Sequence, residues 1–450
     1  MQTIEFVRYM NFFIAILFTL LYAYQFVYMY VSLKNKNKQE EYTPKELHRF
    51  AALICARNEE SVIGEITNTL MKQDYPKELY DIYVLADNCT DNTAKKAREA
   101  GAIVFERFNT ELVGKGYALD YLLKKIASEL PEKHYDAYIV YDADNLIDPN
   151  FIREMNKTYD KGYDASTSYR NSKNFMTNWI TASYAIWFLR EARFMNFPRM
   201  LLGMNCAVSG TGFMVSQRVI DQNGGWPFHL LTEDIEFSAN CALNGVKIGY
   251  CDKAVVYDEQ PTTFHQSYLQ RLRWSKGFYQ INGKYSIALA KKAFKGGKQG
   301  FTCYDIFMTV APGMILSIMG ALINIIYAAA CIGSPYYIAN RVLGEVGHFI
   351  GMSVVNLYIG LVLTALLTVV CEWKNIKARP IDKLKYLPLF PLYMFSYIPI
   401  AVVALFQKVE WKQITHTAVC EGNTVPETIV LDSQHRRVLE KSAAKAEIIS

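Results

Sequence analysis

The chain has 450 residues, of which 51% are hydrophobic and 20% are charged, and its formal net charge is +5. This length suffices for two or three domains, and so mild a charge gives no argument for a nucleic-acid partner. A membrane-spanning helix needs about 20 apolar residues. Four windows that almost lack charge reach that length, at 9–33, 306–340, 346–371 and 386–407. They exclude a purely soluble or disordered protein, and the charged stretch before the second window excludes a transporter built mostly of spans.

Lysine and arginine flank these windows unevenly. Three lysines follow the first window, five cations fill 372–385, and only Arg341 lies between the second and third windows. Because cytoplasmic loops carry the excess of Lys and Arg, we expect the N-terminus outside and residues 34–304 and 372–385 in the cytoplasm. The first window is predicted to be a retained anchor, because it is too long for a signal peptide and lacks a small-residue cleavage site.

The fourth window contains Pro388, Pro391 and Pro399. A window that crosses fully would leave the C-terminus outside, because the chain would then have four spans. A broken or re-entrant segment is the alternative, since proline interrupts the hydrogen bonding of a helix in the membrane. The sequence leaves both arrangements open.

From residue 50 onward, short apolar runs alternate with polar stretches of helical character. The runs 50–55, 80–86, 102–105 and 135–141 are predicted to be buried parallel strands. Helices are predicted between them, over 59–72, 92–100 and 116–129. This alternation indicates an α/β domain with a doubly wound sheet, which binds its ligands at the carboxyl ends of the strands.

Two later stretches, 178–199 and 266–283, mix aromatic, aliphatic and cationic residues with helical spacing. Such helices can lie in the membrane–water interface, where Trp and Tyr sit among the lipid headgroups. They can equally be half-buried helices of the α/β domain. Pattern alone does not decide between the two interpretations.

Acidic residues follow the fourth predicted strand. Asp142 and Asp144 are two residues apart, so both carboxylates can share a divalent cation with a diphosphate. Mg²⁺ or Mn²⁺ suits such oxygen ligands, although aspartate is also common in plain turns. Lys115 lies between two glycines and can meet a phosphate or simply be solvated. Asp87 ends the second strand and can accept from a ribose or shape a turn.

Two further motifs carry chemical groups. Thr232 is placed to cap a helix whose first turn contains Glu233 and Asp234, where the macrodipole favours carboxylates. A general base for sugar transfer is the chemical interpretation of the same carboxylates. In the stretch QRLRW, Gln270, Arg273 and Trp274 share one helix face, which offers an amide, a guanidinium and a ring for stacking on sugar.

The motifs DADN, TED and QRLRW, in this order, resemble those of processive, membrane-embedded family 2 glycosyltransferases, over about residues 48–290. Cellulose, hyaluronan, chitin and poly-N-acetylglucosamine synthases belong to that group. The resemblance implies a GT-A fold, a UDP-sugar donor, a divalent metal and inversion of the anomeric centre.

The resemblance also implies roles for individual residues. Asp144 is expected nearest the metal, with Asp142 on the metal and the UDP. Asp234 is expected to be the catalytic base, with Glu233 beside it. The remaining expected substrate-binding residues are Glu59 and Asp87 for uridine, Lys115 for the nucleotide, and Gln270, Arg271, Arg273 and Trp274 for the diphosphate and acceptor. The turn 209–212 is expected to approach the acceptor closely or to be a plain tight turn.

The implied function is processive synthesis of a β-glucan from UDP-glucose and its secretion through the protein's own channel, with a cellulose-like or mixed β-1,3/1,4 linkage. A polymer of N-acetylglucosamine, or glycosylation of a membrane lipid without polymerisation, remains an alternative. An inactive scaffold is disfavoured, because every acidic position that the chemistry needs is occupied. The expected partners are a UDP-sugar, a growing polysaccharide and the bilayer, at the plasma membrane with a cytoplasmic catalytic domain. No FxVTxK segment or cyclic-dinucleotide domain of the bacterial cellulose synthases is visible.

We therefore expect five parts along the chain. An anchor (1–33) precedes a GT-A catalytic domain (34–260) and interface helices that carry the QxxRW motif (261–304). A membrane region with about three spans (305–407) and a polar tail (408–450) follow.

Overall fold

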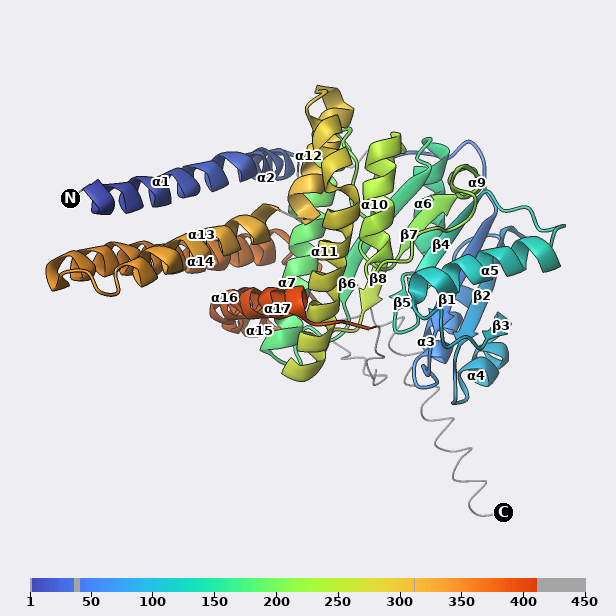
Figure 1. Cartoon of the computed structure of the whole chain (residues 1–450). Helices are drawn as coiled ribbons and strands as arrows, with labels where there is room; N and C mark the ends of the chain where they lie inside the picture. Colours follow the sequence, from blue (N-terminus) through green and yellow to red (C-terminus); the bar gives the residue numbers. More distant parts are fainter. Residues whose placement is uncertain (1, 36–40, 311, 411–450) are drawn as a thin grey trace, which may run out of the picture.

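The computed structural model describes residues 2–35, 41–310 and 312–410, so most of the predicted tail lies outside the described residues. An α/β domain forms one side of the molecule, and helices α1 (Gln2–Tyr22), α13 (Pro312–Ala330) and α14 (Tyr336–Cys371) project from it together (Figure 1). Helices α11 (Phe264–Ala293) and α12 (Gly297–Val310) run across the boundary between the two parts.

The centre of the α/β domain is an eight-stranded sheet in the order β3-β2-β1-β4-β7-β6-β8-β5. Its first half is parallel, as predicted. The four strands of this half coincide closely with the four predicted apolar runs: β1 (Phe50–Ala56), β2 (Tyr80–Asp87), β3 (Ile103–Arg107) and β4 (Ala137–Asp142). These predictions are confirmed.

The second half of the sheet departs from the predicted parallel arrangement. Strand β7 (Phe213–Ser216) runs antiparallel to both of its neighbours, β4 and β6 (Ala165–Ser172). Strand β8 (Ile248–Asp258) is parallel to β6 and antiparallel to the short β5 (Leu146–Ile147). The sequence of β6, ASTSYRNS, contains no apolar run although it is almost wholly buried, so hydrophobic patterning did not reveal it.

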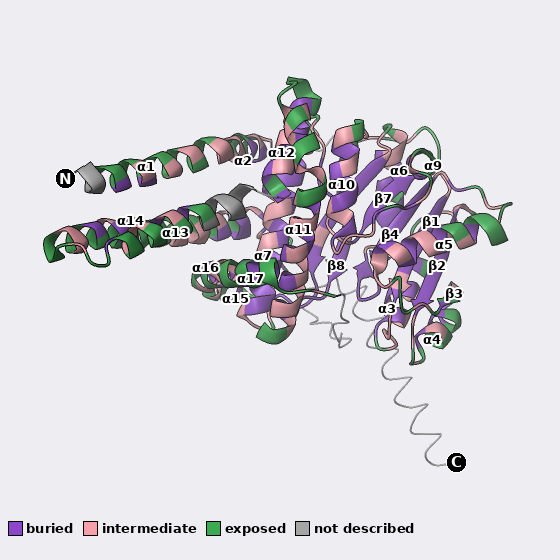
Figure 2. Ribbon diagram, in the orientation of Figure 1, coloured by how far each residue is buried: buried purple, intermediate pink, exposed green. Residues whose placement is uncertain are grey.

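Side chains alternate between the two faces of the sheet, and each face has its own hydrophobic core. Leu53 and Leu85 point to the face covered by α5 (Lys115–Glu129) and α7 (Trp179–Glu191). Ile54 and Val84 point to the opposite face. The helices on that face are α3 (Ile63–Met71), α4 (Thr93–Glu99) and α6 (Phe151–Asp160). Figure 2 shows the strands buried between these two helical layers.

Helix α7 continues through a π-helical turn, Ala192–Asn196, into α8 (Phe197–Leu202). Most of its side chains are buried, and it packs against β6 and α14. This burial favours the packed-helix interpretation of the stretch 178–199 over a helix that lies on lipid. The other short helices of the domain are η1 (Lys77–Leu79), α9 (Gln217–Asn223) and α10 (Glu233–Asn244).

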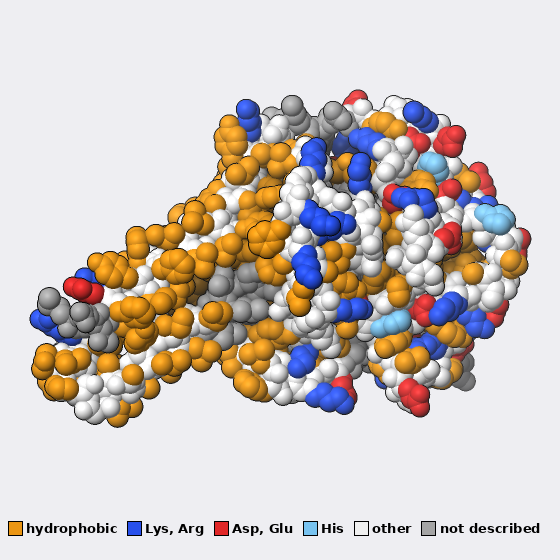
Figure 3. Space-filling view, turned by 45° about the horizontal axis from the view of Figure 1, so that its top comes forward, with side chains coloured by type: hydrophobic (Ala, Val, Ile, Leu, Met, Phe, Trp, Pro, Cys, Tyr) orange, Lys and Arg blue, Asp and Glu red, His pale blue; other side chains and the backbone are white. Residues whose placement is uncertain are grey.

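Among the described residues, three helical stretches are long and apolar enough to cross a membrane. They are Glu5–Lys34, Tyr336–Cys371 and Pro380–Phe406, and a shorter apolar helix covers Met319–Ala330. The first contains α1 and α2 (Tyr24–Lys34). The predicted window 306–340 is not one helix: its start belongs to α12 and its end to α14. Figure 3 shows hydrophobic side chains over the projecting helices and most of the charged ones on the α/β domain.

The predicted fourth window is broken into short pieces. Helix α15 (Pro380–Lys385) is followed by η3 (Leu387–Leu389), α16 (Phe390–Phe395) and α17 (Tyr397–Phe406). Three of these pieces, α15, η3 and α16, carry proline at their first or second position, where proline is tolerated because the N–H it lacks would be unpaired there. The segment is therefore interrupted near its prolines, although the stretch Pro380–Phe406 as a whole remains long and apolar enough to cross a membrane.

The buried carboxylate of Asp305 joins α8, α12 and the first apolar helical stretch. Arg199 of α8 donates from Nε and Nη2 to the carboxylate of Asp305 in α12, at 2.7 and 2.8 Å. The hydroxyls of Tyr24 and Tyr28 of α2 donate to the same carboxylate at 3.0 and 2.8 Å. Both charged side chains are only 2% exposed, so this carboxylate is fully paired in a dry environment.

We expect Asp305→Asn to destabilise the protein strongly, because it leaves the Arg199 guanidinium buried without a counter-charge. Breaking a buried ion pair in this way costs about 3–5 kcal/mol. Thermal unfolding of the full chain in detergent measures the effect as a lower Tm. Asp120→Asn is a matched control, because Asp120 pairs with the exposed Lys124 and surface pairs contribute about 0–1 kcal/mol. Equal Tm values for the two variants would contradict the assignment.

Candidate active site

The ends of strands β1, β2 and β4 and the start of helix α5 meet at one edge of the sheet. Lys115, the first residue of α5, forms an ion pair with Asp142 at the end of β4. Its ammonium also donates to the Gly210 carbonyl at 2.7 Å. Burial by itself would raise the pKa of Asp142, but the charges of Lys115, Arg170 and Arg273 lower it overall. Asp142 is therefore ionised at neutral pH.

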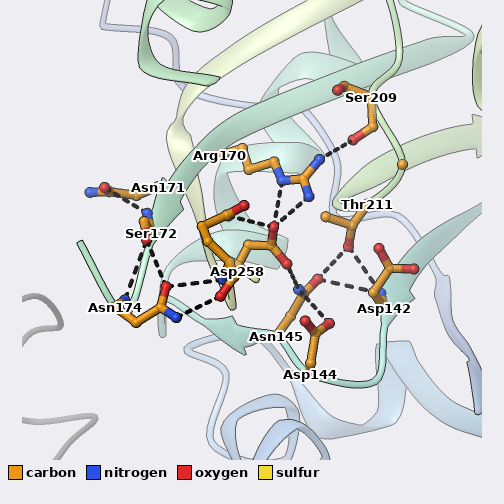
Figure 4. A network of polar contacts seen from close by, with 12 residues as sticks. Asp142, Asp144, Asn145, Arg170, Asn171, Ser172, Asn174, Ser209, Thr211 and Asp258 are labelled. Atoms are coloured by element: carbon orange, nitrogen blue, oxygen red, sulfur yellow. Dashed lines mark hydrogen bonds and ion pairs between the residues drawn. The ribbon is translucent and has the colours of Figure 1, made fainter. Parts of the chain in front are cut away.

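The acidic loop after β4, residues 142–145, is held by the amide of Asn145 (Figure 4). Asn145 Nδ2 donates to Asp144 Oδ1 at 3.3 Å, and its Oδ1 accepts from the Asp142 backbone N–H and the Thr211 hydroxyl. Asp144 is 7% exposed and Asn145 1%. The two predicted metal-binding carboxylates thus lie side by side on a loop that other side chains fix.

The carboxylates of Asp142 and Asp144 are too few to hold a hard cation alone, so a bound substrate has to supply further oxygen ligands. No group of three or more His, Cys, Asp or Glu that could hold a metal occurs within the described residues. Mg²⁺ and similar ions are commonly held by one or two carboxylates together with phosphate oxygens of a substrate. The donor set of Asp142 and Asp144 fits that arrangement.

The predicted base, Asp234, lies in the first turn of α10 and faces the turn 209–212. The Gly210 backbone N–H donates to Asp234 Oδ2 at 2.6 Å. Gly210 has φ +73°, a left-handed conformation that glycine adopts without strain. In the structure this turn is tight and its direct contact is with Asp234, while its approach to an acceptor stays a prediction.

Burial dominates the ionisation of the two carboxylates in this helix turn. It raises the pKa of Glu233 to about 7, with the charge of Asp234 adding to the effect. It also raises the pKa of Asp234, against the N–H groups of Ile235 and Gly210 and the charge of Lys115. A carboxylate with a raised pKa is a stronger proton acceptor than a free aspartate.

Helix α10 starts where predicted, with Glu233 and Asp234 in its first turn, but the predicted side-chain cap is not made. Thr232 occupies the position before the helix, but its side chain makes no capping hydrogen bond. Its hydroxyl is buried against Gly277 of α11, where any side chain on residue 277 would collide with it. Tertiary packing has displaced the local capping interaction.

The QxxRW motif lies on α11, and the structure brings part of it to the site. Arg273 is close enough for its charge to lower the pKa of Asp142 and to oppose the rise in that of Asp234. The Trp274 ring packs edge-on against Tyr184 and Phe188 of α7, with centroids 5.8 and 6.3 Å apart. Gln270 Oε1 is buried and has no hydrogen-bond partner in the described part of the chain.

Arg271 is not brought to this site. It is fully buried on the far side of α11, because successive helix residues point about 100° apart. Its guanidinium donates to the Tyr393 carbonyl at 3.0 Å and to the Ser396 hydroxyl, and lies 4.6 Å from the centre of the Tyr393 ring. The expected substrate contact is therefore corrected: in this structure Arg271 holds α16 and α17 against α11.

The two residues expected at the uridine lie at the ends of the neighbouring strands. Asp87 ends β2 and is 6% exposed, and its carboxylate accepts from Arg107 Nη1 at 2.6 Å. Burial raises its pKa against the charge of Arg107. Glu59 follows β1, and its backbone N–H donates to the Thr93 hydroxyl at 2.8 Å. Both lie at the same sheet edge as Asp142.

Two charged residues at the site were not predicted from the sequence. Arg170 of β6 and Asp258 at the end of β8 form a buried ion pair beside the acidic loop (Figure 4). Arg170 lies in the polar stretch ASTSYRNS, which is typical of a loop, so it did not stand out. Asp258 ends the apolar run AVVYD, as Asp87 and Asp142 end theirs, so the sequence did contain a signal for it.

The fold and the paired carboxylates at its strand ends define a GT-A glycosyltransferase. The family described as "Glycosyltransferase like family 2" matches residues 48–277, just over half of the chain, and the chain belongs to it. The predicted fold class and enzyme class are therefore confirmed.

Two relatives and one solved structure show what the chain is similar to. It is 26% identical to the beta-monoglucosyldiacylglycerol synthase of Nostoc sp. over 322 residues, 69% of this chain and 64% of that protein. It is 26% identical to the poly-beta-1,6-N-acetyl-D-glucosamine synthase of Staphylococcus aureus over 256 residues, 54% of this chain and 58% of that protein. The match thus spans less than two thirds of either relative.

The mannosyltransferase PcManGT from Pyrobaculum calidifontis, solved with GDP-Man and Mn²⁺, has a similar fold. The match has a TM-score of 0.53 at 15% identity and covers 89% of this chain and 99% of that one. At this identity the likeness concerns the fold alone.

We expect substitution of the two arginines of QRLRW to have different effects. Arg271→Met removes the hydrogen bonds from the guanidinium to Tyr393 and Ser396, which contribute about 1.5–3 kcal/mol each, so Tm falls while UDP affinity is retained. Arg273→Met removes a charge near Asp142 and lowers the transfer rate about 10²–10³-fold at unchanged Tm. Thermal unfolding and UDP-release assays on the two purified variants separate these outcomes. Loss of transfer in Arg271→Met at the wild-type Tm would restore its substrate role.

Proposed function

We propose that this glycosyltransferase moves a sugar, with inversion, from a UDP-sugar to a hydroxyl group presented at the membrane surface. One geometric observation carries the proposal. A Cβ built on Gly210 would lie 3.8 Å from Asp142 Oδ2, 3.9 Å from Asp234 Oδ2 and 3.6 Å from Arg170 Nη1. The carboxylates assigned to the donor and to the base therefore surround the same small space.

The residues around this space can supply the proton acceptor and the positive charge that the reaction needs. Asp234, made more basic by burial, accepts the proton of the acceptor hydroxyl as its oxygen attacks the anomeric carbon. The bond to UDP breaks on the opposite face of the sugar. Arg273 and Lys115 supply positive charge on the side of Asp142, where negative charge develops on the leaving UDP.

Asp142 and Asp144 are the residues that would hold Mg²⁺ or Mn²⁺ with the donor diphosphate. A bound divalent cation would screen the charge on the departing UDP. The oxygen-only donor set and the Mn²⁺ present in the similar mannosyltransferase support this cofactor. Glu59 and Asp87, at the ends of the next two strands, are proposed to meet the uridine.

The acceptor is proposed to be a membrane lipid, glucosylated once on a diacylglycerol-type hydroxyl. The glucosyldiacylglycerol synthases among the relatives support this acceptor.

Processive synthesis of a polymer is the second candidate. The half-buried Trp274 offers a ring on which a sugar can stack, and the poly-N-acetylglucosamine synthase is also a relative. A β-glucan made from UDP-glucose, cellulose-like or with mixed linkage, and a polymer made from UDP-N-acetylglucosamine both remain within this candidate.

Location and organisation follow from the same proposal. We propose that the chain spans the plasma membrane more than once, with the N-terminus outside and the catalytic domain of residues 34–260 in the cytoplasm, where lysines follow the first segment. Residues 261–304 then hold the QxxRW motif at the membrane-facing side, and 305–407 form the membrane region.

The decisive experiment is product analysis with the full chain in lipid nanodiscs that contain diacylglycerol. UDP-glucose, UDP-N-acetylglucosamine and UDP-glucuronate, each radiolabelled in the sugar, are supplied with Mn²⁺. We expect label from UDP-glucose in one organic-soluble glycolipid. Water-soluble or insoluble material that forms a ladder on a sizing gel would support the polymer instead. Absence of any transferred label would contradict both candidates.

We expect Asp234→Asn to lower transfer about 10²–10⁴-fold, the usual contribution of a general base. Calorimetric UDP affinity should stay at the wild-type value, because the uridine and diphosphate contacts are elsewhere. Asp221→Asn, on the exposed surface of α9, is the matched control and should transfer normally. Undiminished transfer by Asp234→Asn would overturn the assignment of the base.

A further inference from the structure

The unpredicted pair Arg170–Asp258 connects strands β6 and β8, which run side by side in parallel. Arg170 Nε lies 2.9 Å from Asp258 Oδ2, and Nη2 donates to the same oxygen. The two side chains are 13% and 3% exposed. The Phe188 ring packs on the guanidinium with 3.7 Å between its centroid and Cζ. Sheet, ring and carboxylate therefore fix the arginine in one orientation.

Asp258 reaches the acidic loop. Its Oδ1 accepts from Asn145 Nδ2 at 3.0 Å, and its Oδ2 also accepts from Gln260 Nε2 at 2.8 Å. The same Asn145 amide contacts Asp144 and the backbone N–H of Asp142. The position of the donor-side carboxylates is thus linked to Asp258 through a single side chain.

Arg170 reaches the turn that orients the base. Its Nη1 donates to the Ser209 carbonyl at 3.2 Å. The next backbone N–H, that of Gly210, is the donor to Asp234 Oδ2. A displacement of the guanidinium would therefore move the group that holds the catalytic carboxylate.

We infer that Arg170 and Asp258 are positioning residues. They fix the donor-binding loop 142–145 relative to the turn 209–212, whose Gly210 N–H holds Asp234. The inference rests on the proposed function, because it assigns the two loops to donor and base. Each end of the pair holds one loop, and the reacting groups must meet within the space beside Gly210. A displacement of about 1 Å between reacting groups can lower a rate about 100-fold.

A double-mutant cycle in kcat tests this inference. Asp258→Asn and Arg170→Met should each lower kcat about 100-fold. The double variant should be within about threefold of the worse single variant, because both substitutions cut the same connection. Multiplicative losses would overturn the inference. The double variant also removes both charges, so it remains measurable if a single variant with one unpaired charge fails to fold.

Arg170→Lys separates geometry from charge. Lysine keeps the positive charge but has no planar fork with which to bind Asp258 and Ser209 together. Its kcat should remain within about threefold of that of Arg170→Met. Recovery of the wild-type kcat by lysine would show that charge alone suffices and would overturn the positioning role.

A binding measurement keeps this inference separate from the proposed reaction. The affinity of the full chain for UDP with Mn²⁺, measured by calorimetry, should fall about tenfold in Asp258→Asn, because the single amide oxygen can accept from Asn145 or from Arg170 but not from both. Arg218→Met, in a similar but exposed pair with Asp164, is the matched control and should leave affinity and kcat unchanged. If the wild type binds UDP but transfers no sugar, the proposed function is refuted. The role of the Arg170–Asp258 pair is then still tested by the UDP affinity of Asp258→Asn. Unchanged affinity in Asp258→Asn would count against the pair itself.

Discussion

Burial makes an unpaired charge costly, and the architecture of this enzyme depends on how each buried or half-buried carboxylate at the sheet edge meets a cation or an N–H group. Asp142 has Lys115, Asp87 has Arg107 and Asp258 has Arg170. Each pair joins two elements that are distant in the sequence. The strand ends are therefore fixed by the same contacts that set the electrostatics of the site.

Asp234 differs from Asp142, because its carboxylate is held by a backbone N–H group rather than by a directly bound cation. Burial raises the pKa of Asp234, whereas the charges of Lys115, Arg170 and Arg273 lower that of Asp142. At the same edge of the sheet, Asp142 thus has a lowered pKa and Asp234 a raised pKa. This contrast suits a site that must bind a charged donor and also accept a proton.

Much of this arrangement could be predicted from the sequence, because its evidence is local. The apolar runs gave β1 to β4, and the order of the acidic and QxxRW motifs pointed to Asp142, Asp144, Asp234 and Arg273. The remainder depends on packing between distant segments. Strand β6 is polar yet buried, Arg271 turns toward α16 and α17, and Thr232 packs on Gly277 instead of capping its helix. Spacing identifies which residues share a helix face, but it does not identify which neighbour that face will meet.

The carboxylate of Asp305 binds Arg199 and both tyrosines of α2. Helix α2 belongs to the first membrane segment, whereas Arg199 belongs to the α/β domain. A long apolar helix adapts to a thinner bilayer by tilting. Tyr24 and Tyr28 lie one helical turn apart and donate to the same carboxylate, so Asp305 fixes both the rotation of α2 about its axis and the direction in which it leaves α8 and α12.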